Sequence, residues 1–86
     1  METQTVDYKN LSISQLARLI RKDWKKVNYA AEPYLSAMAD LETINDYYGA
    51  DDGKEIVTYF LCNAASYRGE HAKAIRAELK RRVGIK

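Results

Sequence analysis

The chain has 86 residues, of which 47% are hydrophobic and 30% are charged, and its formal net charge is +2. A chain of this length forms one small domain that buries roughly 60% of the surface of its unfolded state, which argues against a deep catalytic cleft. The composition is that of a globular protein and not of a disordered one.

The expected compartment follows from cysteine usage and from hydropathy. The single cysteine, Cys62, cannot form an internal disulfide, which favours a reducing compartment. No run of about 18 apolar residues is present, and the first ten residues lack the basic-then-apolar order of a signal peptide. We therefore expect a cytoplasmic protein without a membrane partner, and we interpret the glycosylation sequon at 10–12 as a chance match.

The chain begins with an arm and a first helix. Residues 1–10 show no periodicity and are expected to be a flexible arm or a short strand, followed by one helical domain over 11–86. Ser12 and Gln15 have the spacing of a capping box, which predicts a helix over about residues 12–27. At 100° per residue, one apolar stripe follows that helix. It comprises Ile13, Leu16, Leu19, Ile20, Trp24 and Val27.

Two further helices are predicted in the middle of the chain. The second begins near Pro33, which suits a first helical turn, and its apolar spacing extends to Ile44. The third opens at Asp52, with Glu55 three residues later in a second capping pattern. Its segment 56–67 is apolar on nearly every side, which is typical of a buried helix at the centre of a domain.

A fourth helix is expected from about Glu70 to Val83, after a break at Gly69 and before a stop at Gly84. The predicted fold is therefore all-α: a compact bundle of three to four helices around the buried helix 56–67. An α+β domain with a strand over 3–9 is the alternative, but one strand cannot form a sheet without a partner chain.

The hexapeptide RKDWKK at 21–26 places an aspartate inside the apolar stripe of the first helix. An unpaired buried carboxylate is costly, so Asp23 should be paired or hydrogen-bonded, and a structural role is favoured over a catalytic one. Arg68 is the predicted partner in a structural ion pair. Alternatively, Asp23 lies at the edge of the stripe and pairs locally with Lys26, or meets solvent on the Arg18 side.

Charge is segregated along the chain. Residues 18–27 carry five basic and one acidic side chain, and residues 69–86 carry six and two, so each segment has a net charge of +4. Residues 28–67 hold seven acidic residues and one lysine, a net charge of −6. Such a field steers encounters with charged partners more than it stabilises a fold.

The residues needed for catalysis are scarce. With one histidine and one cysteine the chain offers too few zinc ligands, and it lacks the glycine-rich phosphate motifs. Cys62 is predicted to be a small core residue and His71 a surface or capping residue. Calcium is disfavoured because Tyr48 and Ala50 stand where carboxylates belong. We therefore expect no enzyme and no catalytic, cofactor-binding or metal-binding residues.

The basic residues of the first and fourth helices predict a surface that could neutralise phosphates. They are Arg18, Arg21, Lys22, Lys25, Lys73, Arg76 and Lys80. The isoelectric point of about 8.7 is below the value of about 9 that is typical of nucleic-acid-binding domains, and the acidic middle would repel DNA. Non-specific binding is favoured over base recognition.

Seven tyrosines in 86 residues indicate a protein-binding surface, because tyrosine is enriched at interfaces. The predicted contact patch, called the acidic patch below, comprises Asp46, Tyr47, Tyr48, Asp51 and Asp52. It could dock on a basic groove and mimic the charge of a nucleic acid. The alternative is that both of its tyrosines close the edge of the core. The remaining tyrosines of the helical region are predicted core residues: Tyr29, Tyr34, Tyr59 and Tyr67.

The segments RKDWKKVNYAAEPYL and YFLCNAASYRGEHAKAIRAELKRR resemble small proteins carried by bacterial phages and mobile elements. The resemblance implies a non-enzymatic binder that inhibits or redirects a nucleic-acid-handling machine, anti-CRISPR-type inhibitors included. Its partner would be a host or mobile-element protein. A small nucleic-acid-binding regulator that uses the first and fourth helices is the alternative. Apolar faces on the third and fourth helices also leave a homodimer open.

Overall fold

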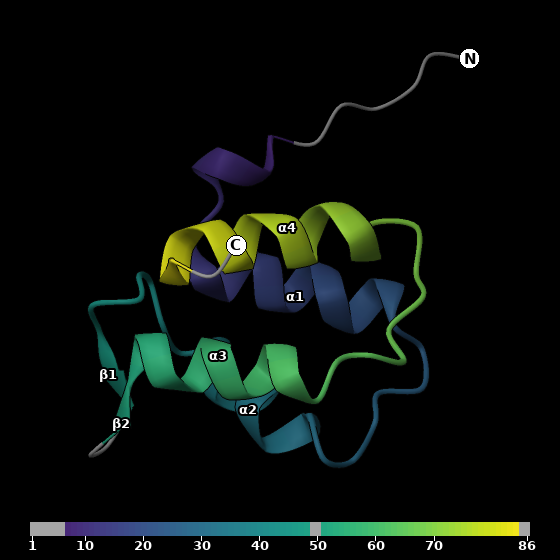
Figure 1. Ribbon diagram of the computed structural model, residues 1–86, viewed down its shortest axis with the longest axis horizontal. Coiled ribbons are helices and arrows are strands. Elements are labelled where there is room, and N and C mark those ends of the chain that lie inside the picture. Colours follow the sequence, from purple (N-terminus) through teal and green to yellow (C-terminus); the bar gives the residue numbers. More distant parts are fainter. Residues whose placement is uncertain (1–6, 49–50, 85–86) are drawn as a thin grey trace.

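The computed structural model describes residues 7–48 and 51–84, and the predicted all-α bundle is confirmed. Figure 1 shows α1 beside α4 in one layer, with α2 and α3 in the other. α1 and α3 each pack on both α2 and α4, so the core lies among four helices and not around one of them. The elements of the described residues are η1 (Tyr8–Asn10), α1 (Ile13–Asp23), α2 (Glu32–Met38), β1 (Tyr47–Tyr48), β2 (Asp51–Asp52), α3 (Gly53–Cys62) and α4 (Ala72–Val83).

α1 begins where the capping box predicts. Gln15 N–H donates to Ser12 Oγ at 3.1 Å, and Ser12 N–H donates to Gln15 Oε1 at 2.8 Å. The helix ends at Asp23, several residues before the predicted end, because Trp24 has an extended backbone with φ −101° and ψ 91°. This early end turns the indole into the core, where it stacks on Tyr67 with ring centroids 5.1 Å apart.

α2 and α3 are also shorter than predicted. Pro33 lies in the first turn of α2 as expected, but this helix ends at Met38 and does not reach Ile44. α3 has the predicted N-cap, since Glu55 N–H donates to the Asp52 carboxylate at 2.8 Å, and it ends at Cys62.

The prediction that the helix 56–67 is buried on all sides is wrong. The side chain of Tyr59 is 51% exposed, and Cys62, predicted to lie in the core, is exposed as well. A helix that shares its core with three others buries only the face directed at them, and hydroxyl or thiol groups can face water. The buried residues of the segment are Ile56, Val57, Phe60, Ala64 and Tyr67.

The described part of the N-terminal arm packs on α4. Tyr8–Asn10 form a short 3₁₀ helix, so these residues are not a strand. Arg82 Nη2 donates to the carbonyl oxygens of Tyr8 at 2.8 Å and Lys9 at 3.2 Å. The Tyr8 hydroxyl also lies 2.6 Å from His71 Nδ1. Residues 1–6 lie outside the described part of the chain.

α4 begins at Ala72 and ends at the predicted glycine stop, where Gly84 has a φ of 83°. Its one buried charge, Glu78, is 7% exposed and accepts a hydrogen bond from Arg82 Nε at 2.7 Å. Since Arg82 also holds η1, this pair joins the end of α4 to the start of the described chain.

A substitution at Gly69 tests the close approach between α1 and the connector that precedes α4. A methyl group there would overlap the Asp23 carboxylate and lie 2.7 Å from the Asp23 carbonyl oxygen. We expect Gly69→Ala to lower the free energy of unfolding by about 2 kcal/mol in a denaturant titration. The control Ser66→Ala, at an exposed position of the same connector, should change it by less than about 0.5 kcal/mol. Equal stability of the two variants would contradict this close packing.

Candidate functional site

Asp23 is hydrogen-bonded and not ion-paired. Its carboxylate accepts from the Tyr67 hydroxyl at 2.6 Å, from Glu70 N–H at 2.9 Å and from His71 N–H at 2.8 Å. The predicted ion pair with Arg68 is wrong, since Arg68 is exposed and no salt bridge of the described residues includes it. Backbone N–H groups just before a helix stabilise a carboxylate without the desolvation of a second charge.

The three donors determine the ionisation of Asp23. Partial burial alone would raise the pKa of this carboxyl, but the hydrogen bonds from Tyr67, His71 and Glu70 outweigh it and hold the pKa below its ordinary value. The pKa of Tyr67 is raised, first by burial and then by the adjacent Asp23 carboxylate. Both shifts keep Asp23 charged and Tyr67 protonated at neutral pH.

This cluster is structural. It connects α1 to the segment before α4, and Figure 1 shows that segment passing the C-terminal end of α1. Arg76 extends it, since its Nη1 donates to the Tyr67 carbonyl oxygen at 2.6 Å. The donors to the Asp23 carboxylate all belong to the chain itself, so its oxygens already accept hydrogen bonds within the fold.

The candidate chemical residues are dispersed. Exposed Cys62 is the last residue of α3. His71 lies at the other end of the connector between α3 and α4, where it contacts Tyr8. The part of the chain that the structure describes contains no group of three metal-ligating side chains. Among the same residues, no helix has the length and apolar character needed to cross a bilayer.

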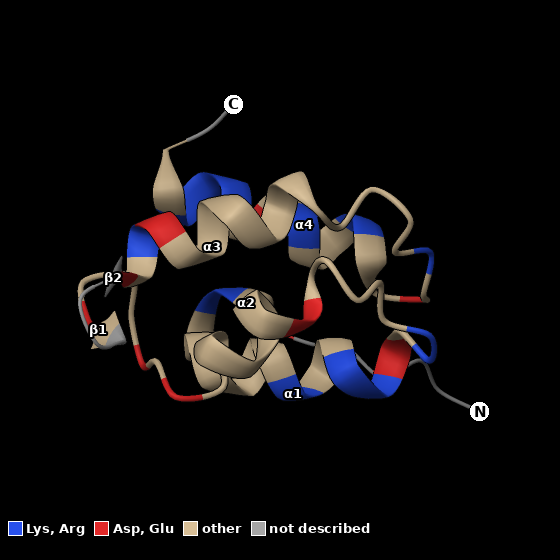
Figure 2. Cartoon of the chain, turned by 90° about the horizontal axis from the view of Figure 1, so that it is seen from below, with Lys and Arg blue, Asp and Glu red and all other residues tan. Residues whose placement is uncertain are grey.

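The predicted basic surface divides into paired and unpaired side chains. Arg21 lies 3.0 Å from Glu32 of α2, and Arg76 is half-buried with its guanidinium on the connector. Both are therefore engaged within the chain. Figure 2 shows basic residues along α1 and α4 and several acidic residues along the segment after α2. The members that remain exposed without a salt bridge in the described residues are Arg18, Lys22, Lys25, Lys73 and Lys80.

The acidic patch lies on a short hairpin in which β1 and β2 pair antiparallel. Asp46 accepts from the N–H groups of Glu42 at 2.8 Å and Thr43 at 3.2 Å, so it holds the preceding turn. Asp52 caps α3, and Tyr47 is 68% exposed. The side chains of Tyr48 and Asp51 lie outside the described residues, so only their backbone pairing is placed.

Of the tyrosines predicted as core, Tyr29 and Tyr59 are exposed and Tyr34 is partly buried against the core. Tyr34 of α2 and Tyr59 of α3 are in contact, with ring centroids 5.6 Å apart, and Tyr59 is half-exposed. Tyr29 is 88% exposed and follows Asn28, whose amide lies 3.5 Å from the carbonyl oxygen of Asn63 at the end of α3. We call the side chains of Tyr29, Tyr34 and Tyr59 the tyrosine surface, in which the ring contact is that of Tyr34 with Tyr59.

The helical spacing of the sequence did not predict that these tyrosines are at least partly exposed. Tyr59 lies within a nearly unbroken apolar run, and Tyr34 falls on the apolar side of α2, so periodicity predicts both as buried. Of the four predicted core tyrosines only Tyr67 is fully buried. The one available signal was the hydroxyl group of tyrosine, which allows this residue to remain partly in water.

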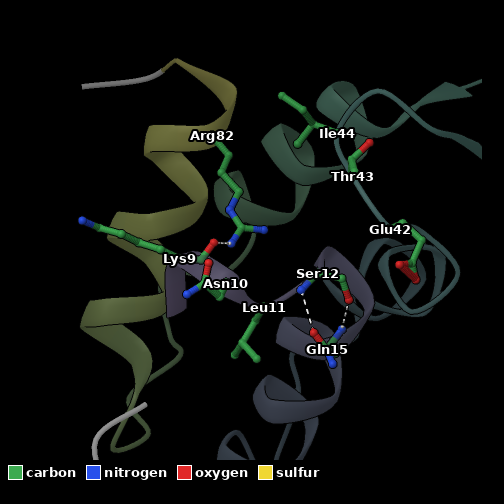
Figure 3. A pocket seen from close by; sticks show the side chains of 9 residues that line it. All are labelled: Lys9, Asn10, Leu11, Ser12, Gln15, Glu42, Thr43, Ile44 and Arg82. Atoms are coloured by element: carbon green, nitrogen blue, oxygen red, sulfur yellow. Dashed lines mark hydrogen bonds between the residues drawn. The ribbon is translucent and has the colours of Figure 1, made fainter. Parts of the chain in front are cut away.

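A shallow depression lies between η1, the start of α1, the segment 42–44 and the end of α4, with a volume of about 540 Å³. Figure 3 shows two hydrogen-bonded groups in its lining: Ser12 with Gln15, and Arg82 with the Lys9 carbonyl. The side chains of Lys9 and Glu42 also line this depression and form no salt bridge among the described residues.

A comparison of the chain with protein-family models, with curated proteins and with solved structures finds no match. The function must therefore be inferred from the exposed tyrosines, the acidic patch and the basic side chains of this chain.

Substitutions at Asp23 test its hydrogen bonds. We expect Asp23→Ala to lower the free energy of unfolding by about 3 kcal/mol, because it leaves the buried Tyr67 hydroxyl and two N–H groups without their acceptor. Asp23→Asn keeps one acceptor oxygen and should be less damaging. The control Arg68→Ala should change stability by less than about 0.5 kcal/mol in the same thermal or denaturant measurement. A large loss with Arg68→Ala would support the ion pair instead.

A fall in pH should reduce the contribution of the Asp23 hydrogen bonds to the free energy of unfolding. Because the pKa of Asp23 is lowered by folding, its contribution is complete above the ordinary value of 3.8 and is lost as the pH falls through the folded-state pKa. The difference in unfolding free energy between the native protein and Asp23→Asn should therefore narrow from pH 6 towards pH 3. Glu78 titrates in both proteins and cancels in the difference. A difference in unfolding free energy that does not change with pH would show that the ionisation of Asp23 does not contribute to stability.

Proposed function

We propose that this chain is a non-enzymatic protein-interaction module that binds a host or mobile-element protein and inhibits or modulates a nucleic-acid-handling machine. The observation that supports it most is the tyrosine surface, where aromatic rings from α2, α3 and the α1–α2 connector are left partly open. The resemblance to small phage and mobile-element proteins, with anti-CRISPR-type inhibitors among the implied functions, gives the kind of partner.

Exposed tyrosines favour protein recognition for a physical reason. A tyrosine ring buries a large apolar area at small cost in side-chain entropy, and its hydroxyl can bond to a partner. Two of these rings already contact each other at 5.6 Å, so a partner would meet a partly ordered aromatic surface. Ordering before contact lowers the entropy lost on binding.

The acidic patch provides the link to nucleic-acid-handling partners. Asp46 and Asp52 are fixed by their hydrogen bonds to backbone N–H groups, and the exposed Tyr47 stands between them in sequence. Carboxylates held in place beside an aromatic ring could occupy a basic channel that otherwise binds nucleic acid. The patch is proposed as a second contact, next in importance to the tyrosine surface.

A small nucleic-acid-binding regulator is the second candidate. It is favoured by Arg18, Lys22 and Lys25, which are exposed along α1 and just after it. Against it, Arg21 and Arg76 are engaged with Glu32 and the Tyr67 carbonyl, which reduces the charge available for phosphates. Protein binding is therefore the preferred function.

Removal of exposed rings tests the proposal. We expect the double variant Tyr29→Ser, Tyr59→Ser to lose most of the protein captured from bacterial lysate by the tagged chain, with the melting temperature little changed because both side chains are exposed. Ala65→Ser with Arg68→Ser, at exposed positions after α3, is the control and should capture as the native chain does. Tyr47→Ser, tested separately, measures the share of the acidic patch.

The same capture, repeated after nuclease treatment, separates the two candidate functions. Capture that survives nuclease and depends on the tyrosines supports direct protein recognition. Capture that disappears with nuclease, or that is unchanged in the double tyrosine variant, would contradict the proposal. The first of these results would favour the nucleic-acid-binding regulator.

A further inference from the structure

We propose that α1 carries a groove that binds an acidic amphipathic helix of a partner protein. The groove uses residues other than the tyrosine surface and the acidic patch, and it rests on the proposed function only in that its occupant is a protein. It is called the α1 groove and is defined by Leu11, Gln15, Arg18, Leu19, Lys22 and Ile44.

Two adjoining depressions form this groove. The first contains Ile44 and Lys9, and Figure 3 shows Leu11 projecting between the start of α1 and η1. The second contains Arg18, Leu19 and Lys22 along α1. Leu11 and Gln15 line both, so the two depressions lie side by side along the start of α1.

The floor of the groove is apolar. Leu11, Leu19 and Ile44 pack against the core but are only partly buried, so each leaves apolar surface at the bottom of the depression. Three such side chains give a partner a place to bury its own apolar residues, and each buried methylene contributes about 0.8 kcal/mol.

The dimensions suit a short helix. From Gln15 to Lys22 the groove follows α1 for about 10 Å at a rise of about 1.5 Å per residue, and Ile44 extends it beyond the start of that helix. A helix that lies in such a groove contacts it through apolar residues at i, i+3 or i+4, and i+7. Leu11 and Leu19 are eight positions apart in the chain, so positions i and i+7 or i+8 of the occupant would lie over them, and a further turn would be needed to reach Ile44.

The rim determines the charge of the occupant. Arg18 and Lys22 are exposed and form no salt bridge among the described residues, whereas Arg21 is held by Glu32. At the other end of the groove Lys9 and Glu42 are of opposite sign. The occupant should therefore carry its carboxylates on the half that faces Arg18 and Lys22.

A helix fits this groove better than a nucleic acid does. Sites for single strands combine basic side chains with aromatic stacking platforms, and no aromatic side chain is among the lining residues. The charged phosphate groups of a nucleic acid would gain no stabilisation from the leucine and isoleucine side chains of the groove. A second copy is also disfavoured, because contact between the acidic patch of one copy and α1 of the next is heterologous and would produce rings or open assemblies and not a two-fold dimer.

The experiment selects binders without assuming a sequence. A displayed library of random peptides of about 16 residues, long enough for about four helical turns, is panned on the intact chain, and the enriched peptides are synthesised with a fluorescent label. We expect them to be acidic, with apolar residues at helical spacing, and to bind saturably in fluorescence anisotropy. Leu19→Gln and the double variant Arg18→Glu, Lys22→Glu should each weaken this binding at least about tenfold.

The matched control reverses the same number of charges on α4. Lys73→Glu with Lys80→Glu changes two exposed side chains without a salt bridge in the described residues, and it should bind the peptides as the native chain does. A labelled DNA duplex of about 20 base pairs, measured at two salt concentrations, is the second control. It should bind weakly and without dependence on Leu19.

Several results would overturn the inference. One is enrichment of no peptide, or of peptides without acidic residues; another is equal weakening by the α1 and α4 charge reversals, or no effect of Leu19→Gln. Tighter binding of the duplex with the same dependence on Arg18 and Lys22 would assign the groove to nucleic acid. Concentration-dependent self-association that is lost in Leu19→Gln would assign it to a second copy. If lysate capture still depends on Tyr29 and Tyr59, the proposed function stands even where the groove fails.

Discussion

The fold depends on one carboxylate at the end of α1. Asp23 accepts three hydrogen bonds from a single short segment of the connector between α3 and α4, and the neighbouring Trp24 stacks on Tyr67 of that segment. A polar anchor and an aromatic stack therefore fix the same place from adjacent residues. Because the donors stand directly before α4, this contact determines where the last helix begins and how it lies beside α1.

The charged side chains that lie in or beside the core are each hydrogen-bonded within the chain. Asp23, Glu78 and Arg76 are satisfied inside or at the edge of the core, and no buried side-chain nitrogen or oxygen of the described residues lacks a partner. The remaining charges lie at the surface, where they cost little. Interactions with partners can use them without a loss of folding stability.

The exposed features divide the surface into regions with different chemistry. The tyrosine surface is aromatic, the hairpin is acidic, and the α1 groove is apolar with a basic rim. Such a division suits a module that recognises more than one element of a partner, or two partners at once. The linking of several weak contacts raises the overall affinity without any one of them being strong.

The sequence by itself determined the fold class and the local signals that begin and end helices. The capping box at Ser12 and Gln15, the cap at Asp52 and the stop at Gly84 are short-range, since each is formed by residues within a few positions. Only the tertiary structure decided the partner of Asp23, the early ends of α1 and α3, and the exposure of Tyr29 and Tyr59. Periodicity states which residues share a face, but a face is buried only if another element covers it. That depends on contacts such as the one between Asp23 and His71, 48 residues apart in the chain.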